Sequence, residues 1–357
     1  MASESTNPRF SKMTKKIKEV INKKYLLKLL EDPTYIPKGY WGTAPTGRIH
    51  VGYLCPLFAI SDLVSEGCEV TILLADIHAH LDNRKSPIDN KLRTEYYKLI
   101  LTEILRLLNV NMDKIKFVLG SDYQYSCEYI KDLYSIVSTI PMSASKDAGT
   151  EVVKSDPNPK LCDLIYPVMQ GLDEKHLKAD FELGGIDQRK IFAFSIDHVH
   201  KFTKKKITYL MNEMVPPLSS VSTINSENLI TKMSSSDSIG KIDLLDNYSQ
   251  LLSKFKKVYC KPCDIEDNTI LILCHRILFP LLERLGHGST VIADRLEKYG
   301  GRLEIKSYDE LVKLYANGTI FPDDLKKCVA KTLSEILKPI HDKFSDPEMI
   351  SLLKKAY

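Results

Sequence analysis

The chain has 357 residues, long enough for two domains that each bury a core. Its 43% hydrophobic and 27% charged residues are ordinary for a soluble globular protein, and a net charge of +4 permits a polyanionic partner without arguing for one. No apolar run approaches the ~18 residues of a membrane span, and the polar start lacks the hydrophobic centre of a signal peptide. We therefore expect no membrane association.

The eight cysteines are scattered and form no disulfide framework, which favours a reducing, cytoplasmic setting. Cys260, Cys263, Cys274 and His275 could be read as a zinc site, but their irregular spacing favours ordinary thiols. We expect no metal ion bound by protein side chains alone.

Residues 1–38 are predicted to form a basic tail and a helix. Apolar residues recur at helical spacing from Met13 to Leu30, and Pro33 closes the pattern. The lysines of this stretch could touch RNA, although a frayed tail before a solvated helix is favoured.

The stretch from Gly39 to Tyr53 reads as a strand, a turn of small residues and the start of a helix. Tyr40 opens the strand, and an apolar run follows Tyr53. Such a turn can place a nucleotide phosphate at the positive end of the helix, where backbone N–H groups have no internal partner. His50 and Gly52 would supply a hydrogen-bond donor and a close backbone approach there.

Strands and helices then alternate, which indicates an α/β domain with a parallel sheet. We expect strands at 68–76, 116–119, 179–183 and 209–217, and helices at 87–108, 159–177 and 191–199. The polar residues 77–83 follow a strand, at the edge where α/β sheets bind ligands. Residues 123–160 interrupt the alternation with helical segments around a flexible polar centre, 143–149, and could form an interface or a plain surface excursion.

Two further patterns suggest a small-molecule site. Tyr166, Gln170 and Asp173 share one face of a predicted helix, where polar groups could converge on a ligand. Gly185 and Asp187 lie at a strand-to-helix junction, which suits close backbone approach and a carboxylate on a ribose.

After about residue 238 the pattern predicts helices alone, so we expect an all-α C-terminal domain over 238–357. The predicted helices are 244–258, 268–285, 307–316, 322–340 and a short one within 341–357.

Just before this border lies the segment Lys232-Met233-Ser234-Ser235-Ser236, behind a small polar loop. Together with His50-Val51-Gly52-Tyr53 it resembles the two signatures of class I aminoacyl-tRNA synthetases, HIGH and KMSKS, with Tyr53 in place of the second histidine. Residues 39–357 as a whole resemble tyrosyl-tRNA synthetases of the archaeal and eukaryotic type. The motifs that carry this resemblance are YWGTAPTG, HVGY, LLADIHAHLDN, LIYPVMQGLDE, GGIDQRKIF, MVP and KMSSSD.

The resemblance implies a Rossmann-like catalytic domain over 39–237, with an inserted interface or tRNA-acceptor segment at about 123–160, and a helical anticodon-binding domain over 238–357. The sequence departs from some animal relatives in lacking their extra domain after Tyr357, so we expect no added tRNA-binding module. The residues implied for tyrosine are Tyr40, Tyr166, Gln170, Asp173 and Gln188. Those implied for ATP are Thr46, His50, Gly52, Gly185, Asp187, Met214, Val215 and Lys232. Catalysis would depend on His50, Lys232, Ser234, Ser235 and Ser236, and the first anticodon base would be recognised by Asp294 and Tyr299.

The implied reaction joins L-tyrosine to ATP, releases pyrophosphate and transfers the tyrosyl group to tRNA(Tyr). The family also implies a homodimer and Mg²⁺ that is bound mostly by phosphates and water. Tryptophanyl-tRNA synthetases share the motifs, but the pair of Tyr40 and Asp173 suits a phenolic hydroxyl better than the single N–H of an indole. A nucleotidylyltransferase, or an RNA-binding relative without activity, is a more remote alternative.

Overall fold

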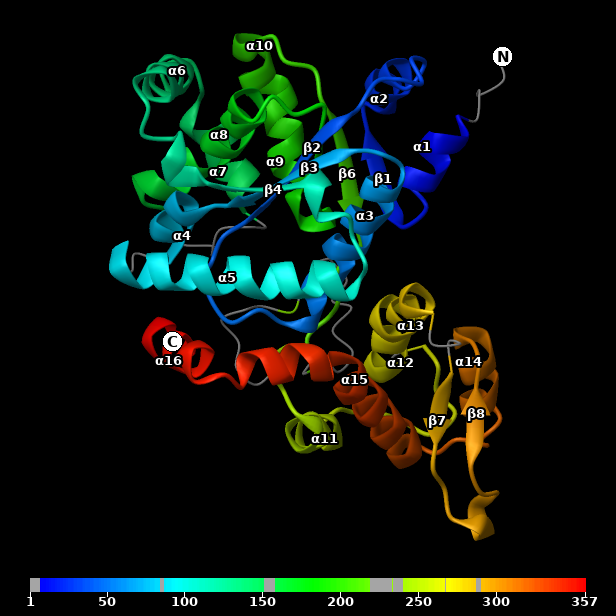
Figure 1. The fold of residues 1–357 in the computed structure, drawn as a ribbon. Coiled ribbons are helices and arrows are strands. Elements are labelled where there is room, and N and C mark those ends of the chain that lie inside the picture. Colours follow the sequence, from blue (N-terminus) through cyan, green and yellow to red (C-terminus); the bar gives the residue numbers. More distant parts are fainter. Residues whose placement is uncertain are drawn as a thin grey trace. The chain divides into compact units, whose positions relative to one another are not determined.

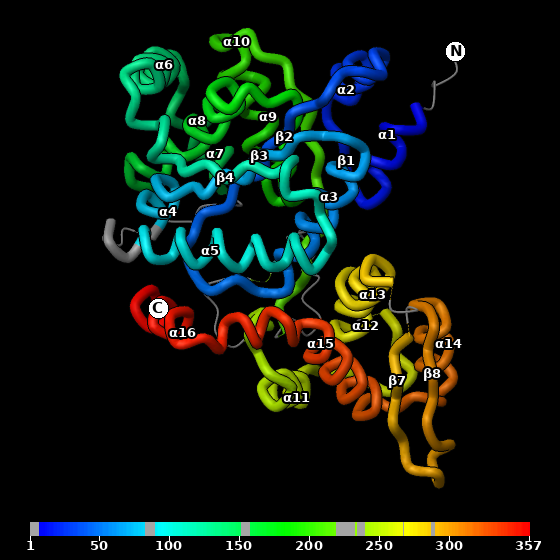
Figure 2. The backbone as a smooth tube through the Cα atoms, in the orientation of Figure 1, coloured from blue at the N-terminus to red at the C-terminus, as the bar shows by residue number. Residues whose placement is uncertain are grey.

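The computed structural model describes residues 7–83, 87–150, 158–218, 233, 240–266, 268–286 and 290–357, and for 83 and 87–89 it describes the backbone alone. Figure 1 shows the elements, and Figure 2 traces the same chain as a tube. The chain divides into two compact units. The first runs to Thr46, continues over Pro56–Glu213 and includes Ala356; the second holds Gly47–Cys55, Met214–Lys355 and Tyr357.

A six-stranded sheet forms the centre of the first unit, in the order β1-β6-β5-β2-β3-β4. All neighbouring strands are parallel except β1, which runs antiparallel to β6. The strands are β1 (Ile17–Ile21), β2 (Lys38–Thr43), β3 (Glu69–Leu74), β4 (Ile115–Leu119), β5 (Phe181–Gly185) and β6 (Thr208–Asn212). The predicted parallel α/β sheet is thereby confirmed.

The predicted helix over 13–30 is wrong. The structure has α1 (Pro8–Met13), then β1, then α2 (Lys23–Leu29). Val20 and Ile21 pair with Leu210 and Tyr209 of β6, so a sheet edge captures apolar residues whose spacing also fits a helix. Asn22, in the left-handed region at φ 57, separates β1 from α2.

Helices flank the sheet of the first unit (Figure 1). They are α3 (Leu54–Ser65), which starts in the second unit, α4 (Asp76–Asn83), α5 (Pro87–Leu107), α6 (Cys127–Val137), α7 (Met142–Gly149), α8 (Leu161–His176), α9 (Arg189–Phe194) and α10 (His200–Thr203). A π-helical turn, Ser195–Val199, joins α9 to α10. Phe192 of α9 stacks on Tyr209 of β6 at a ring-centroid distance of 4.3 Å, in a core that also contains Tyr40.

The interruption predicted at 123–160 consists, where it is described, of α6 and α7. Residues 142–149 form the helix α7, so the prediction of a flexible polar centre at 143–149 is wrong. Ser145 and Ala148 are buried, and the Ser145 hydroxyl donates to the carbonyl of Leu164. Tyr129 and Leu133 of α6 pack in one apolar cluster with residues of α8. This packing holds α6 against the helix that carries most of the residues predicted to bind tyrosine.

The second unit is mostly helical, as predicted. Its helices are α11 (Tyr248–Lys256), α12 (Thr269–Leu273), α13 (Phe279–Leu285), α14 (Tyr308–Ala316), α15 (Pro322–Phe344) and α16 (Pro347–Ala356), with a π-helical turn, Cys274–Leu278, between α12 and α13. The expectation of an all-α domain needs one correction, because β7 (Val291–Ala293) and β8 (Leu303–Ile305) form an antiparallel pair. Each strand has three residues, too few for an alternating pattern to be visible. The domain border predicted between 237 and 238 lies outside the described residues.

In the part of the chain that the structure describes, no helix combines the length and the apolar character that crossing a membrane requires.

Candidate active site

The sheet register of the first unit sets Tyr40 beside Glu182. The two residues pair across β2 and β5, and Glu182 pairs on its other side with Tyr209 of β6. The Tyr40 hydroxyl donates to the main-chain carbonyl of Gln170, at 3.2 Å, and so joins the sheet to α8. Burial, followed by the neighbouring carboxylates, raises the pKa of Tyr40 well above its usual value. Tyr40 therefore stays a neutral hydroxyl.

Asp173 is a buried carboxyl group with several donors. The side-chain amide of Gln124 donates to both of its oxygens, at 2.9 and 3.1 Å, and the Tyr129 hydroxyl donates to Oδ1 at 3.0 Å. Burial raises the pKa of Asp173 to about 7, although these hydrogen bonds act in the opposite direction. The group is thus held in place and is balanced between its neutral and charged forms near neutral pH.

His78, from α4, connects Tyr166 and Asp173 of α8. Its ring meets the Tyr166 ring edge-on at a centroid distance of 4.6 Å, and its Nε2 lies 4.0 Å from Oδ2 of Asp173. Burial lowers the pKa of His78 to about 4, so the imidazole is neutral at pH 7. The contact with Asp173 is therefore not a pair of opposite charges.

A chain of amides starts from Glu182. Gln170 Nε2 donates to Glu182 Oε1 at 2.9 Å and to Gln188 Oε1 at 3.2 Å. Gln188 Nε2 in turn donates to Oδ2 of Asp187 at 3.1 Å. The residues predicted for tyrosine (Tyr40, Tyr166, Gln170, Asp173 and Gln188) thus belong to one cluster of polar side chains in the first unit.

The sequence analysis included His78 in the polar stretch 77–83 at the carboxyl edge of a strand but gave it no binding role, and it missed Gln124, Tyr129 and Glu182. Gln124 follows β4, at the carboxyl edge where parallel sheets bind ligands, so the rule that was applied to 77–83 could have found it as well. Glu182 lies inside a strand whose other residues are apolar or glycine, so an acidic residue at a buried position was the available signal.

In the second unit, His50 begins the 3₁₀ turn Val51–Tyr53. Its Nδ1 accepts a hydrogen bond from the Gly52 N–H at 3.2 Å, which assigns the ring proton to Nε2. A Cβ on Gly52 would lie 2.9 Å from two atoms of the His50 ring and 3.9 Å from Cβ of Val215. Glycine is required at position 52 because the imidazole lies over its backbone.

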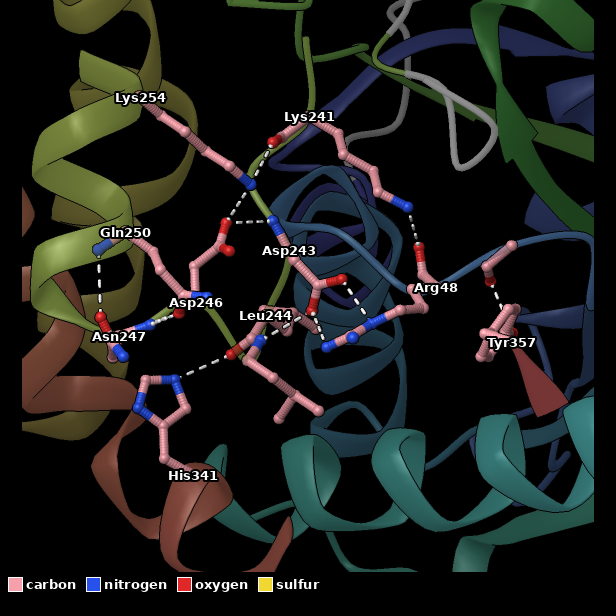
Figure 3. A network of polar contacts seen from close by, with 12 residues as sticks. Arg48, Lys241, Asp243, Leu244, Asp246, Asn247, Gln250, Lys254, His341 and Tyr357 are labelled. Atoms are coloured by element: carbon pink, nitrogen blue, oxygen red, sulfur yellow. Dashed lines mark hydrogen bonds and ion pairs between the residues drawn. The ribbon is translucent and has the colours of Figure 1, made fainter. Parts of the chain in front are cut away.

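A polar network fixes the segment that carries His50 (Figure 3). Arg48 forms an ion pair with Asp243, in which Nη2 donates to Oδ1 at 3.2 Å and Nε lies 2.8 Å from Oδ2. The Asp243 N–H donates to Oδ2 of Asp246 at 2.8 Å, and Lys254 pairs with the same oxygen at 2.5 Å. Lys241 Nζ donates to the Arg48 carbonyl at 3.3 Å.

Main-chain hydrogen bonds add to this contact. The Val51 N–H donates to the Ile242 carbonyl at 2.9 Å, and the Leu244 N–H donates to the Ile49 carbonyl at 3.1 Å. The His50 segment is therefore paired with the residues that follow the KMSSS sequence.

The other residues predicted for ATP are placed as follows. The Thr46 carbonyl accepts from Arg93 at 2.9 Å, and Gly185 ends β5 and caps the turn Ile186–Gln188. In the second unit the Met214 carbonyl accepts from the side chain of Arg276, and the buried Val215 accepts from the N–H of Met233 at 2.9 Å. Lys232, Ser234, Ser235 and Ser236 lie outside the described residues.

The predicted anticodon pair lies in the loop between β7 and β8. Lys331 pairs with Oδ2 of Asp294 at 2.7 Å, and this hydrogen bond lowers the pKa of Asp294. Tyr299 is 56% exposed. The Arg295 side chain donates to the carbonyls of Gly301, Gly300 and Thr319, at 3.1, 3.5 and 2.5 Å, so the loop that presents Tyr299 is internally bonded.

The described ranges contain no group of three His, Cys, Asp or Glu side chains that could hold a metal ion.

Comparisons with known proteins agree with this architecture. The family model described as tRNA synthetases class I (W and Y) matches residues 36–338. The cytoplasmic tyrosine–tRNA ligase of Gallus gallus is 40% identical over 350 residues, which are 98% of this chain and 63% of that protein. The chain thus spans less than two thirds of that relative. The cytoplasmic tyrosine–tRNA ligase of Saccharomyces cerevisiae is 40% identical over 97% of this chain and 86% of its own length.

A solved structure of tyrosyl-tRNA synthetase from Archaeoglobus fulgidus, in complex with L-tyrosine, has a TM-score of 0.80 and 29% identity, and the match covers 94% of this chain and 98% of that one. The family match, which extends over most of the chain, shows together with these relatives that the chain belongs to the class I tRNA synthetases of the tryptophan and tyrosine group.

Proposed function

We propose that the protein is a tyrosine–tRNA ligase, which activates L-tyrosine with ATP and then transfers the tyrosyl group to the 3′ end of tRNA(Tyr). The observation that carries the proposal is the buried carboxyl of Asp173, held by Gln124 and Tyr129 in one polar cluster with Tyr40 and Gln170. The names of the similar proteins support the same substrate.

Tyr40 and Asp173 would bind the phenolic hydroxyl of tyrosine. Phenylalanine would leave these buried groups without a hydrogen-bond partner, which lowers its binding affinity. Enzymes of this class are known to discriminate tyrosine from phenylalanine by a factor of ~10⁵. Tyr166, Gln170 and Gln188 would bind the amino and carboxyl groups.

The tyrosine carboxylate is itself a nucleophile for the α-phosphorus of ATP, so the first step needs no side-chain base. A C–O–P bond forms as the bond to pyrophosphate breaks. The protein would accelerate this step by aligning the reactants and by placing donors where negative charge develops.

His50 would donate from Nε2 to a phosphate, with Lys232 and Ser234–Ser236 on the pyrophosphate. Thr46, Gly52 and Gly185 would approach the nucleotide, Asp187 would bind the ribose, and Met214 and Val215 would lie by the adenine. Mg²⁺ would accompany ATP on its phosphate oxygens and water, which are the ligands this ion prefers.

In the second unit, Asp294 and Tyr299 would recognise the first anticodon base of the tRNA. An exposed tyrosine on an internally bonded loop can stack on a base, a contact worth ~1–3 kcal/mol. We also place the protein in the cytoplasm, as the names of its relatives indicate.

A homodimer is proposed from the surface of α6, α7 and the start of α8. Large apolar side chains are unusually exposed there: Tyr125 at 70%, Tyr134 at 68%, Met142 at 72% and Leu161 at 75%. Grouped exposure of this kind marks an interaction surface in a folded protein.

Tyrosine-dependent exchange between ATP and pyrophosphate tests the proposal, with tryptophan and phenylalanine as parallel substrates. We expect exchange with tyrosine alone. Exchange with tryptophan would keep the reaction class and overturn the substrate, whereas a folded protein that exchanges with none of the three would overturn the activity.

A further inference from the structure

Glu182 is a buried acidic residue to which the proposed reaction assigns no role. It is 2% exposed and lies in the middle of the sheet, between Tyr40 and Tyr209 in register. Its Oε1 accepts from Gln170 at 2.9 Å, and its Oε2 is buried with no hydrogen bond. Burial, and then the charge of Glu174, raises the pKa of Glu182, so the group tends to be neutral. Burying a carboxyl group with one oxygen that forms no hydrogen bond costs free energy of folding.

The hydrogen bonds around Glu182 determine which way each amide points. The Asp187 carboxylate, when ionised, can only accept, so Gln188 must direct its NH₂ group at Asp187. The carbonyl oxygen of Gln188 then faces Gln170, and the Gln170 NH₂ group donates a hydrogen bond to it. The second N–H of that group goes to Glu182.

Both N–H donors of Gln170 are therefore used, and its carbonyl oxygen is left as the acceptor. The Tyr40 hydroxyl also holds the main chain of Gln170. An amide turned the other way would set its NH₂ group against the ammonium group of an amino acid, which carries donors alone.

We propose that Glu182 is a positioning residue for the amino end of the substrate: together with Gln188 it holds the NH₂ group of Gln170, so that the carbonyl oxygen of that amide faces the α-ammonium group. This inference rests on the proposed tyrosine substrate. Glu182 acts through Gln170 and makes no contact with the reacting atoms.

The test compares two tyrosine analogues that share the phenol and differ at the other end. Tyramine keeps the ammonium group and lacks the carboxylate; 3-(4-hydroxyphenyl)propionate keeps the carboxylate and lacks the ammonium group. Their inhibition constants are measured against tyrosine in the exchange assay, with the full chain. In Glu182→Leu, which removes the acceptor, we expect the ratio of the tyramine constant to the propionate constant to rise about five- to tenfold.

The ratio cancels any loss at the phenolic end, including one transmitted through Tyr40. Glu182→Gln keeps a carbonyl acceptor at the same place and should restore the ratio to within about twofold of the wild type. Asp180→Asn serves as the matched control. That carboxyl is also buried but accepts from the Tyr35 hydroxyl and the Lys38 N–H rather than from Gln170, so the ratio should not move.

An unchanged ratio in Glu182→Leu, or an equal rise in Asp180→Asn, would overturn the inference. If Glu182→Leu does not fold, an altered ratio in Glu182→Gln that exceeds the twofold limit would do so. Wild-type protein that shows no tyrosine-dependent exchange would overturn the proposed function instead, so the two failures are distinguishable.

Discussion

At the scale of single residues, Asp173 links the stability of the fold to pH. The unfolded chain would release this proton near the ordinary value of 3.8, whereas the folded protein holds it up to about 7. Between these values the folded state binds more protons, so stability falls as the pH rises through this window. The ionised Asp173 carboxylate, which can accept a hydrogen bond from a phenol, therefore lowers the free energy of unfolding.

We predict that Asp173→Asn abolishes this part of the pH dependence. Urea unfolding at pH 5 and pH 8 should show the wild type losing about 2 to 3 kcal/mol more than the variant over that interval. Asp197→Asn, at an exposed position, is the control and should follow the wild type. Parallel curves for wild type and Asp173→Asn would show that the Asp173 carboxyl ionises at its ordinary value.

At the scale of elements, the sequence identified β3, β4 and β5 because each is a short apolar run between turns. The predicted strand at 209–217 extended too far, since β6 ends at Asn212. The sequence pattern misjudged β1, whose residues Ile17, Val20 and Ile21 fit a helix equally well until β6 is present as a partner. The hairpin of β7 and β8 was missed because its strands are too short to display a period. Tertiary pairing, which local patterns do not contain, decided these cases.

The pairing of Arg48 with Asp243 is a second feature of this scale. It ties the His50 segment to residues 241–246, so the position of His50 depends on a contact distant in sequence. We predict that Asp243→Ala slows tyrosyl-adenylate formation roughly tenfold, with little change in tyrosine affinity, because the lost contact is worth on the order of 1.4 kcal/mol.

Pre-steady-state quenched flow would give this rate, and equilibrium dialysis the affinity. Glu304→Ala removes an exposed partner of Arg302 in the same unit and should leave the rate as it was. A loss of tyrosine affinity as large as the loss of rate in Asp243→Ala would contradict the assignment.

At the scale of the whole molecule, the apolar surface around α6 and α8 predicts self-association. Leu161→Asp should shift the protein towards the monomer in sedimentation velocity at micromolar concentration. The substitution suits the fold, because Leu161 is the first residue of α8 and a carboxylate stabilises a helix N-terminus. Phe321→Asp, at the N-cap of α15 and likewise exposed, is the matched control and should keep the mass of the wild type. A wild type that is already monomeric would contradict the proposed dimer.

Recognition of tRNA belongs to the same scale. It concerns the second unit, whereas the residues proposed to bind tyrosine lie in the first. We predict that Tyr299→Ala lowers kcat/KM for tRNA charging by about ten- to a hundredfold and spares ATP–pyrophosphate exchange. Tyr259→Ala, another exposed tyrosine of that unit, should charge normally. Equal losses in charging and exchange would remove Tyr299 from the anticodon site.

The site itself was predictable in part. Motif resemblance found the polar face of α8, and the structure brings Tyr166, Gln170 and Asp173 into one cluster. Motif resemblance did not find Gln124 or Glu182, because their roles depend on the residues to which they hydrogen-bond once the strands and helices have assembled. Roles that depend on contacts between distant segments leave no local spacing to read.

The hydrogen bond that begins the turn at His50 also constrains the chemistry of its ring. Because Nδ1 accepts the Gly52 N–H, a proton could be added to the imidazole only by giving up the hydrogen bond that begins the turn. With Nδ1 accepting from the Gly52 N–H, the proposed phosphate contact would be a directional hydrogen bond from Nε2. Release of pyrophosphate would then require His50 to give up one hydrogen bond and no ion pair.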